Sequence, residues 1–485
     1  MVQQKFIRDL FWLQLLNWLI KPVWILVLEN TVQNRLGEEL YGSYFVVFNF
    51  SLLFTIIMDM GMNSMITRET ASGHNPRLLW KSAFPAKLLL SIAYTACTLL
   101  IGWSQHLSTS LLFVVILNQM LLQWILFFRA YLQGAGKGRI DAWFSVLDRV
   151  VAIVLCLAWI QGSLFSGKEG LLLFALSQTA GYGFALILIS IQVNRLVFRK
   201  AAAPVDSGSG TLHMFEVLRS SLGFALLALL MAGFTRIDAL MLQLLREDGT
   251  YQAGLYARGF RLLDAGLIFP VLMSTLLLPA FTSKTGDKKE LTRLAETGGV
   301  LMFLMALPAA AIGFAYAGPL MSLLNPESAG KDFEGIPVLA WLMLAYLPMS
   351  LVYVYGTLLT AMKRLRLLNV VALLAVGLNI ALNLLFIPRF GALGTAWSAG
   401  LTQAFFCLNC IWFSRGALEG MPGKYLPAIF ILALVCALLA WFLQYLGLAW
   451  YVQVAGALGT WSLLLITGKL HPDLHLKQFL SVRDA

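Results

Sequence analysis

Three charged side chains lie on one segment, GLYARGFRLLDAGLIFP (254–270), whose other residues predict a membrane-spanning helix: Arg258, Arg261 and Asp264. At about 100° per residue they cover an arc of about 120°, so one helix face carries all three. A basic side chain near the bilayer centre costs about 2.5–3.5 kcal/mol, and it therefore usually faces a water-filled cavity or a partner. Because the planar guanidinium group matches phosphate and carboxylate oxygens, the pattern predicts an anion-binding cavity within the membrane.

Two further basic residues are predicted at a similar depth. Lys21 lies in the first predicted span and Arg236 in the outer half of the seventh, and together with Arg258 and Arg261 they form the predicted substrate-binding set. The alternative is a structural role, in which Asp264, three residues after Arg261, neutralises that arginine as a pair buried between helices.

Two other acids are predicted within the membrane, Asp59 in helix 2 and Asp238 in helix 7. Either carboxylate can hold a basic partner in one state of the protein or bind a coupling cation. A structural ion pair is favoured, and the alternative stays open. With Asp264, these residues form the predicted ion-pair or coupling set.

The elements that position these charges are long apolar helices. Of the 485 residues, 59% are hydrophobic and 12% are charged, whereas roughly 25% are charged in soluble globular proteins. Apolar runs of about 18 residues or more predict an all-α polytopic membrane protein. We expect fourteen transmembrane helices, at 9–29, 43–64, 84–104, 110–130, 145–163, 170–192, 215–242, 252–280, 298–324, 336–361, 367–388, 393–414, 425–446 and 448–468.

The Lys and Arg residues predict the orientation of these helices, because positive flanks stay on the cytoplasmic side. With the N-terminus inside, the inner segments are rich in Lys and Arg and the outer segments are poor in them, and Lys87 is counted among the inner flanks. Both termini are therefore predicted to be cytoplasmic. The net charge of +11 indicates topology and affinity for anionic lipids, not nucleic-acid binding.

Internal repeats predict the domain organisation. YGSY at 41–44 resembles AGLY at 253–256, and the connections after helices 4 and 10 also resemble each other. We therefore expect two pseudo-symmetric six-helix bundles, an N-lobe at 1–200 and a C-lobe at 201–422. Residues 423–485 would then add helices 13 and 14 and a cytoplasmic tail.

Two motifs resemble a nucleotide-binding site and a redox site, but they lack the residues or the surroundings that such sites need. GSLFSGKE at 162–169 has Glu169 where a P-loop needs Ser or Thr for magnesium. CLNC at 407–410 has CxxC spacing, but it stands alone at bilayer depth, so a helix contact is favoured over redox chemistry. The sequence predicts no catalytic set and no metal site, and it disfavours an enzyme or an ATP-driven pump.

Several long segments resemble a known family: GEELYGSYFVVF, MDMGMNSMITRE, LQGAGKGR, GLYARGFRLLDAGLIFPVLMSTLLLPAF and AMKRLRLLNVVALLAVGLNIALNLLFIPRFGALGTAWS. Through them the sequence resembles, nearly end to end, the polysaccharide (O-antigen type) flippases of the multidrug/oligosaccharidyl-lipid/polysaccharide exporter superfamily.

The resemblance implies a flippase for lipopolysaccharide and O-antigen biosynthesis. It would move an undecaprenyl-pyrophosphate-linked oligosaccharide repeat unit across the bacterial inner membrane by alternating access through a cationic central cavity. The resemblance makes Lys21, Arg236, Arg258 and Arg261 the candidates to line that cavity, and helices 13 and 14 would form a groove for the prenyl tail. It implies no cofactor and leaves proton or sodium coupling open. Its partners would be the lipid-linked oligosaccharide, membrane lipids, and the polysaccharide polymerase and ligase machinery.

Three alternatives remain. Lipid II flippases also have fourteen helices and a basic cavity. Drug or cation antiporters of the same superfamily typically have twelve helices and rely on buried acids, so the extra helix pair and the basic excess argue against them. A non-transporting membrane scaffold of a polysaccharide-synthesis complex would tolerate neutralisation of Arg261, whereas a flippase would not.

Overall fold

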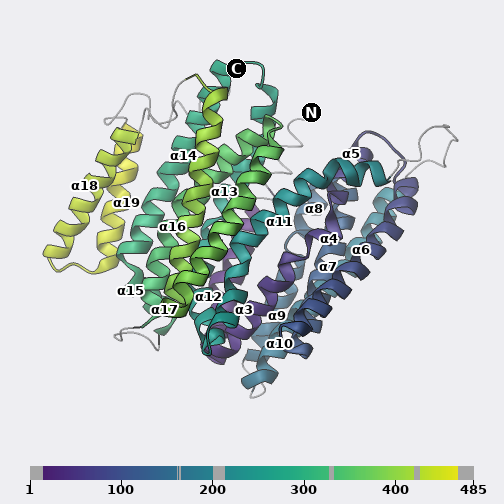
Figure 1. Ribbon diagram of the computed structural model, residues 1–485, viewed down its shortest axis with the longest axis horizontal. Coiled ribbons are helices and arrows are strands. Elements are labelled where there is room, and N and C mark those ends of the chain that lie inside the picture. Colours follow the sequence, from purple (N-terminus) through teal and green to yellow (C-terminus); the bar gives the residue numbers. More distant parts are fainter. Residues whose placement is uncertain are drawn as a thin grey trace. The chain divides into compact units, whose positions relative to one another are not determined.

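All regular structure in the described part of the chain is helical. The computed structural model describes residues 12, 15–160, 162, 165–199, 214–326, 333–419 and 426–467, and no strand occurs among them (Figure 1). Eleven helical segments are long and apolar enough to cross a membrane. The last of these, Leu365–Ala417, changes direction at Gly391 and supplies two spans, and α18 (Leu426–Tyr445) and α19 (Trp450–Thr467) add two more. The predicted all-α fold with fourteen membrane helices is confirmed.

The helices form two compact units. The first comprises Met1–Ala265 and Ala372–Thr395, and the second comprises Gly266–Val371 and Ala396–Ala485. These units are defined by contacts between helices, and their bounds differ from those of the lobes that the internal repeats predict. The predicted lobes at 1–200 and 201–422, with the addition at 423–485, stay a prediction.

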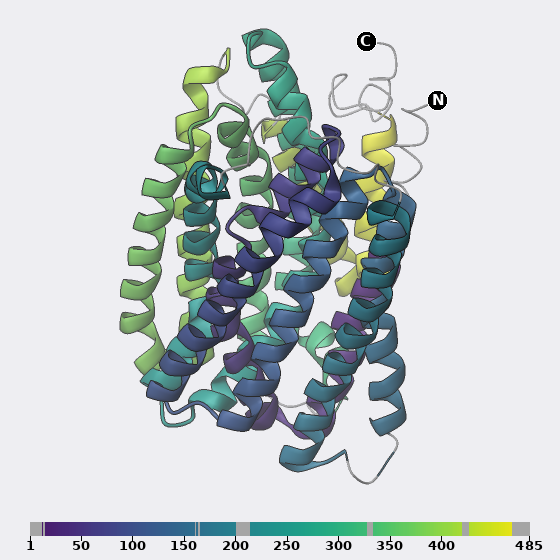
Figure 2. The same ribbon diagram turned by 90° about the vertical axis from the view of Figure 1, so that its right-hand side faces the viewer.

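All seven charged residues of the two predicted sets lie in the first unit, whose purple-to-blue helices run side by side in Figure 2. Its helices, in chain order, are η1 (Val23–Leu28), α2 (Glu29–Leu36), α3 (Glu38–Leu53), α4 (Ile56–Asp59), α5 (Met62–Ala71), α6 (Pro76–Ser104), α7 (Thr109–Gly134), α8 (Gly138–Phe144), α9 (Leu147–Ile160), α10 (Gly167–Val193), η2 (Asn194–Phe198), α11 (Met214–Leu245) and α12 (Gly249–Gly266). The part of α17 (Leu365–Ser414) from Ala372 to Thr395 completes the unit.

An aromatic cluster holds together one side of the first unit. The ring of Trp80 in α6 lies 5.6 Å from that of Phe127 and 5.4 Å from that of Phe128, both in α7. It also lies 5.4 Å from the ring of Phe198 in η2. Aromatic pairs at these centroid distances are favourable beyond the area that they bury, so the cluster fixes α6 and η2 against α7.

The second predicted span, 43–64, is broken near its end. α3 ends at Leu53 and α5 begins at Met62, and between them Met60 (φ 40°) and Gly61 (φ 83°) adopt left-handed conformations. Such a φ is uncommon for a residue with a side chain. The ammonium group of Lys87, which is fully buried, donates to the carbonyl oxygen of Met58 at 2.9 Å. The sequence analysis was therefore wrong to count Lys87 among the exposed flanks, because this cation satisfies a carbonyl that the helix break leaves open.

Two glycines of the internal repeat allow α3 and α12 to touch backbone to backbone. A Cβ added to Gly42 would lie 1.8 Å from the carbonyl oxygen of Thr250, and one added to Gly254 would lie 2.1 Å from that of Glu38. Gly254 and Thr250 occupy the positions in the second half that Gly42 and Glu38 occupy in the first. Reciprocal contacts of this kind are characteristic of two-fold symmetry, so the repeat seen in the sequence has a direct counterpart in the packing.

A polar turn fixes the start of α12 against the bend in α17. Arg246 Nε donates to Asp248 Oδ1 at 2.6 Å, and these hydrogen bonds hold the pKa of the Asp248 carboxyl below its usual range. The carboxamide of Gln252 donates to Asp248 Oδ2 at 2.8 Å and accepts from the backbone amide of Ala392 at 2.9 Å. Gly391 provides the bend with a left-handed φ of 53° that favours glycine.

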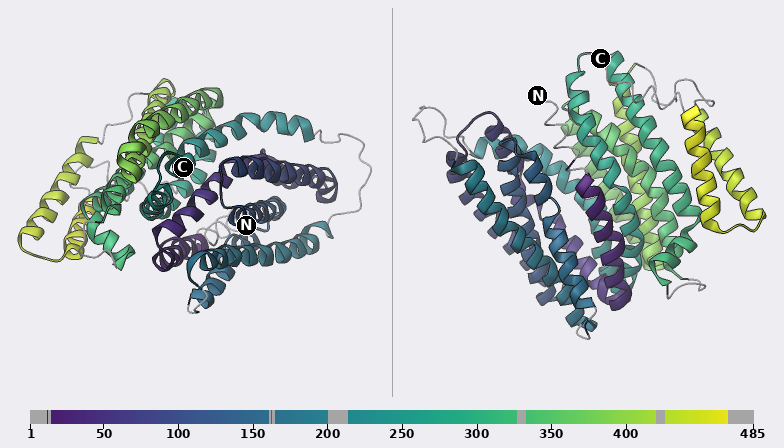
Figure 3. Two further views of the ribbon diagram at one scale, coloured as in Figure 1. Left: turned by 60° about the horizontal axis from the view of Figure 1, so that its bottom comes forward. Right: turned by 180° about the vertical axis from the view of Figure 1, so that it is seen from behind.

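The second unit is built around α16 (Gly335–Ala361), which packs against α13 (Ile268–Ser283) and α14 (Lys288–Ala315). α15 (Ala317–Leu324) continues α14, and η4 (Arg415–Ala417) follows α17. α18 and α19 pack against each other as a hairpin (Figure 3). Tyr316 donates its hydroxyl hydrogen to Gln453 Oε1 in α19 at 2.8 Å, and this bond helps to attach the hairpin. Cys407 and Cys410 are buried free thiols, in agreement with a helix contact.

Candidate functional site

A polar cavity of about 200 Å³ lies within the first unit, enclosed by the first helix, α3, α9 and α12 together with α11. Four basic and two acidic side chains line it: Lys21, Arg149, Arg236, Arg261, Glu29 and Asp264. An aromatic wall, which includes Trp24, Tyr41 and Phe260, forms much of the remaining surface. The structure thus brings together three of the four predicted substrate-binding residues, with an excess of positive charge.

Arg261 is the most deeply buried of these cations, with 4% of its side chain exposed. Its guanidinium carbon lies 4.5 Å from the centroid of the Tyr41 ring. One terminal nitrogen donates to Gln33 Oε1, and Nε lies 3.4 Å from Glu29 Oε2. The other terminal nitrogen, Nη1, is buried without a hydrogen-bond partner among the described residues. Because an unsatisfied buried donor costs about 1–3 kcal/mol, and more when charged, a ligand oxygen that reached this atom would remove that cost.

Arg236 and Asp264 form the second charged pair of the cavity. Arg236 Nη1 lies 3.5 Å from Asp264 Oδ2 and donates to Asn49 Oδ1 at 3.4 Å. Its guanidinium carbon lies 5.3 Å from the centroid of the Phe260 ring. The alternative prediction, a buried pair between Asp264 and Arg261, does not form here, because Arg261 turns toward Glu29 and Asp264 pairs with Arg236. A carboxylate three residues away on one helix competes here with carboxylates from neighbouring helices, and the latter have the better geometry.

Lys21 and Arg149 complete the cationic lining. Lys21 is half-buried, and Arg149 Nη1 donates to the carbonyl oxygen of Ser145 over a long 3.5 Å. Neither cation belongs to an ion pair within the 4.0 Å limit in the described structure. The nearest compensation comes from electrostatic interaction with Asp148, next to Arg149 in α9, and the cavity wall as a whole keeps more basic than acidic side chains.

Arg258 does not line this cavity. Only 1% of its side chain is exposed, and Nε donates to Glu38 Oε1 at 2.8 Å. Nη1 donates to Asn30 Oδ1 at 3.2 Å and to Asn34 Oδ1 at 2.5 Å. The surrounding carboxylate and carboxamides give Arg258 the environment of a structural ion pair that connects α12 to α2 and α3.

The predicted basic partner of Asp238 is absent from its described surroundings. Tyr256 donates its hydroxyl hydrogen to Oδ2 at 2.9 Å, and Asn383 and Asn379 donate to Oδ1 at 2.8 Å and 3.2 Å. Asp238 is only 1% exposed. Neutral donors thus surround the carboxylate, so the structural ion pair favoured for Asp238 by the sequence analysis does not form in this structure.

Asp59 lies at the helix break. Its Oδ1 accepts from the backbone amide of Asn63 at 3.3 Å. Lys87 lies near enough to interact with the Asp59 carboxylate electrostatically, so the nearest basic group comes from α6.

Sequence analysis missed Glu29, Glu38, Arg149 and Lys87. Glu29 and Glu38 lie at the ends of α2 and α3, close to the short connection between the first two spans, where a charge is expected to face water. Arg149 and Lys87 were assigned to cytoplasmic flanks. No spacing in the sequence identifies Glu38 and Glu29 as the partners of Arg258 and Arg261, because these pairs join different helices.

A fourteen-helix membrane protein with uncompensated cations in a buried polar cavity has the architecture of a secondary transporter. The family model described as "Polysaccharide biosynthesis protein" matches residues 6–284, and the one described as "Lipid II flippase MurJ" matches residues 150–466. Each covers more than half of the chain. The chain therefore belongs to the polysaccharide biosynthesis and lipid-linked flippase family.

Solved structures show the same fold. Lipid II flippase MurJ in an inward closed conformation is 12% identical, with a TM-score of 0.70 over 97% of this chain and 99% of that chain. An inward-facing multidrug resistance MATE family transporter of the MOP superfamily is 13% identical, with a TM-score of 0.66 over 83% and 97%. A MOP superfamily transporter from Pyrococcus furiosus, described as having a binding pocket of reverse polarity, is 15% identical, with a TM-score of 0.61 over 84% and 95%. No curated protein matches the chain in sequence.

Proposed function

We propose that this membrane flippase translocates an undecaprenyl-pyrophosphate-linked oligosaccharide repeat unit across the bacterial inner membrane by alternating access. The observation that carries the proposal is the cavity in the first unit, where Arg261 Nη1 is buried without a partner and Lys21, Arg149 and Arg236 add positive charge. The pyrophosphate of a sugar-linked lipid offers several acceptor oxygens and two negative charges. Charge-assisted hydrogen bonds from guanidinium groups are the strongest interactions that such a headgroup can make.

The substrate-binding residues of this proposal are Lys21, Arg236 and Arg261, with Arg149 added from the structure. Glu29 and Asp264 lower the net charge of the cavity, so that the cations remain stably buried before the substrate arrives. Arg258, predicted to belong to the same set, is assigned by its contacts to holding Arg261 and α12 in place.

Translocation also needs a driving force, for which we propose proton or sodium coupling through Asp238. A buried carboxylate without a basic partner can bind either a proton or a metal cation as its counter-charge. Both termini are expected to be cytoplasmic, as the positive flanks indicate. The polymerase and ligase of the same polysaccharide would act on the translocated product.

The proposal is tested by the amount of prenyl-linked oligosaccharide in lipid extracts of the native host lacking the gene. Wild-type protein should clear the accumulated lipid, and Arg261→Ala should fail to do so at an equal level in the membrane. Loss of a charge-assisted hydrogen bond, about 1.5–3 kcal/mol, corresponds to a decrease of roughly 10- to 100-fold. Arg35→Ala removes an exposed arginine at the end of α2 and is the matched control, which should clear the lipid normally.

The same experiment separates the alternatives. Full clearance by Arg261→Ala would favour a non-transporting scaffold, because a scaffold does not need a cationic cavity. The match to the lipid II flippase family model favours lipid II as the second candidate substrate, and mass spectrometry of the accumulated headgroup distinguishes a peptide-bearing lipid from an oligosaccharide. Efflux of a cationic drug without any lipid accumulation would indicate an antiporter.

A further inference from the structure

Two more polar cavities lie next to the cationic one in the first unit. The middle cavity, of about 210 Å³, shares Leu52 with the cationic cavity. The outer cavity, of about 510 Å³, shares Asn63 and Leu126 with the middle cavity. Shared lining residues place the three in a continuous series that follows the broken second helix from α3 through α4 to α5.

The middle cavity lacks the basic side chains that line the cationic cavity. The middle cavity contains Thr55, Asp59, Asn63 and Gln123 and has no basic residue. Ser64, Thr67 and Gln133 continue the neutral polar surface in the outer cavity. Such hydroxyl and carboxamide groups both donate and accept hydrogen bonds, as the hydroxyl groups of a sugar do.

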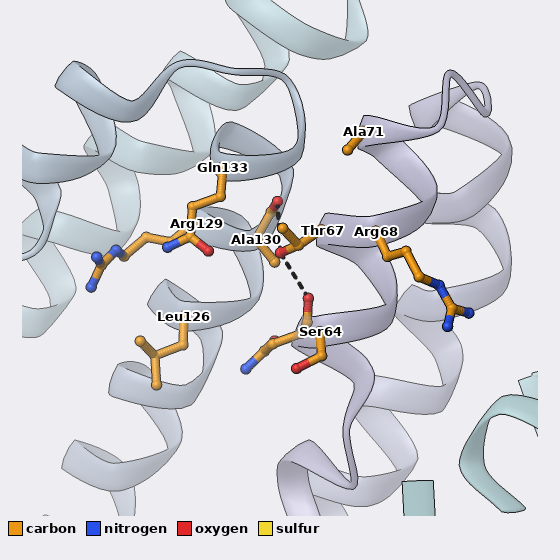
Figure 4. A pocket seen from close by; sticks show the side chains of 9 residues that line it. Ser64, Thr67, Arg68, Ala71, Leu126, Arg129, Ala130 and Gln133 are labelled. Carbon is orange, nitrogen blue, oxygen red and sulfur yellow. Dashed lines mark hydrogen bonds between the residues drawn. The ribbon is translucent and has the colours of Figure 1, made fainter. Parts of the chain in front are cut away.

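The two arginines of the outer cavity do not form an anion clamp. Arg68 and Arg129 project from α5 and α7 toward opposite sides, while Thr67 bridges the helices by donating to the carbonyl oxygen of Ala130 at 3.3 Å (Figure 4). Arg129 is occupied by Asp141, with Nε at 2.6 Å from Oδ1. Arg68 is 69% exposed and pairs with Glu69. These contacts disfavour a second phosphate site.

Two residues that line the middle cavity carry buried acceptor atoms. Asn63 Oδ1 and Gln123 Oε1 are buried and have no hydrogen-bond partner among the described residues. Buried polar atoms are nearly always satisfied by protein, ordered water or a ligand. Both atoms require a donor, and Asp59 in the same lining disfavours an anionic one.

We infer that the middle cavity is a sugar subsite, in which Asn63 and Gln123 accept hydrogen bonds from an uncharged sugar adjacent to the pyrophosphate. The outer cavity would hold the next part of the oligosaccharide. This inference rests on the proposed function and deepens it. It makes the broken second helix together with α7, and not the cationic cavity, the part of the protein that selects the sugar.

The experiment compares two defined probes on the purified full-length protein in lipid nanodiscs. The sugar-free probe is undecaprenyl pyrophosphate as its methyl ester, so that it carries the same two negative charges as undecaprenyl-pyrophosphate-linked N-acetylglucosamine, which has one neutral sugar. The measured quantity is the ratio of their dissociation constants, obtained by native mass spectrometry. Two hydrogen bonds at about 0.5–1.5 kcal/mol each predict that wild type binds the sugar-bearing lipid roughly 5-fold or more tightly.

Asn63→Ala and Gln123→Leu should each lower this preference by about 2- to 10-fold and leave the affinity for the sugar-free probe unchanged. Gln119→Leu is the matched control, because Gln119 lies one turn away in α7, is buried, and has an unpartnered Oε1, but lines none of the three cavities. Gln123→Asn keeps the carboxamide but shortens it, and it provides a second test if the leucine variant does not fold.

The outcomes separate the two proposals. The sugar subsite is overturned if wild type shows no preference, if both cavity variants keep the wild-type ratio, or if Gln119→Leu loses it equally. An unchanged ratio would mean that these acceptors bind water only. The flippase proposal would survive those results if Arg261→Gln weakens binding of both lipids to the same extent. If wild type binds neither lipid, the proposed substrate and the sugar subsite are both wrong.

Discussion

The ion pair between Arg258 and Glu38 offers the sharpest test of which arginines are structural. Arg258→Met removes the charge but keeps a long apolar stem, and it leaves the Glu38 carboxylate, which is only 10% exposed, without its cation. Asn30 and Asn34 lose a donor at the same time. If Arg258 serves structure, removing Glu38 as well should repair most of the damage.

The distance between the Arg258 and Glu38 side chains gives the expected change in the free energy of unfolding. At 2.8 Å and an effective dielectric constant of about 20, the attraction between unit charges is about 6 kcal/mol, which is offset by the cost of desolvating both groups. Removing one member of a buried pair typically costs 3–5 kcal/mol, whereas replacing both members by neutral groups is often close to neutral. We therefore expect Arg258→Met to lower the free energy of unfolding by about 3–5 kcal/mol. In the double variant Arg258→Met, Glu38→Gln we expect at least about 2 kcal/mol of that loss to be recovered.

The assay is a double-mutant cycle in one detergent, with unfolding followed by denaturant titration and function by clearance of lipid-linked oligosaccharide in the host. Arg261→Met is the comparison, because the same substitution one turn further along α12 should reduce clearance more than stability. The reasoning is refuted if the double variant is as unstable as Arg258→Met. It is also refuted if Arg258→Met has wild-type stability but clears no lipid, since Arg258 would then act on the substrate.

Two further predictions concern the repeat contact and the coupling site. Gly42→Ala and Gly254→Ala should each lower the free energy of unfolding by about 1–3 kcal/mol, because the added methyl group overlaps a backbone carbonyl. Gly183→Ala is the control and should be neutral or slightly stabilising, since a Cβ there meets nothing within 4 Å. Equal changes in the free energy of unfolding at all three positions would contradict the predicted contact. Asp238→Asn should abolish the dependence of lipid translocation on a sodium or proton gradient in proteoliposomes, since a neutral amide holds no counter-cation; gradient dependence equal to that of wild type would assign Asp238 to structure.

The fold could be predicted from the sequence because each span is an apolar run that the bilayer requires to be helical. The resemblance of YGSY to AGLY also predicted the repeat whose glycines meet in the structure. The break between Leu53 and Met62 was not predicted, because one glycine, Gly61, does not by itself show where a helix breaks, and the contact of Lys87 with the Met58 carbonyl oxygen is not visible in the sequence. That contact comes from 29 residues away, beyond the range of local periodicity.

The candidate site was predicted only in part. Intramembrane arginines are expensive enough to stand out in a sequence, so Arg236 and Arg261 were identified. The acidic partners of Arg261 and Arg258 were not identified, because Glu29 and Glu38 lie near helix ends, where charges are ordinary. Which carboxylate pairs with which arginine depends on how α2, α3 and α12 pack, and no spacing along one helix contains that information. Asp264 shows this clearly, since it lies one turn from Arg261 but pairs with Arg236.

Arg258 and Arg261 differ in how completely their positive charge is satisfied. They lie one turn apart on α12, and both are nearly inaccessible to solvent. Carboxylate and carboxamide oxygens surround Arg258, whereas Arg261 keeps Nη1 unpaired beside a cavity with three further cations. A protein selected only for stability would pair or replace this guanidinium group, because an unsatisfied buried donor is destabilising. The presence of Arg261 is explained if an oxygen of the substrate accepts a hydrogen bond from Nη1. Binding of the pyrophosphate would then complete the hydrogen bonding of this guanidinium group.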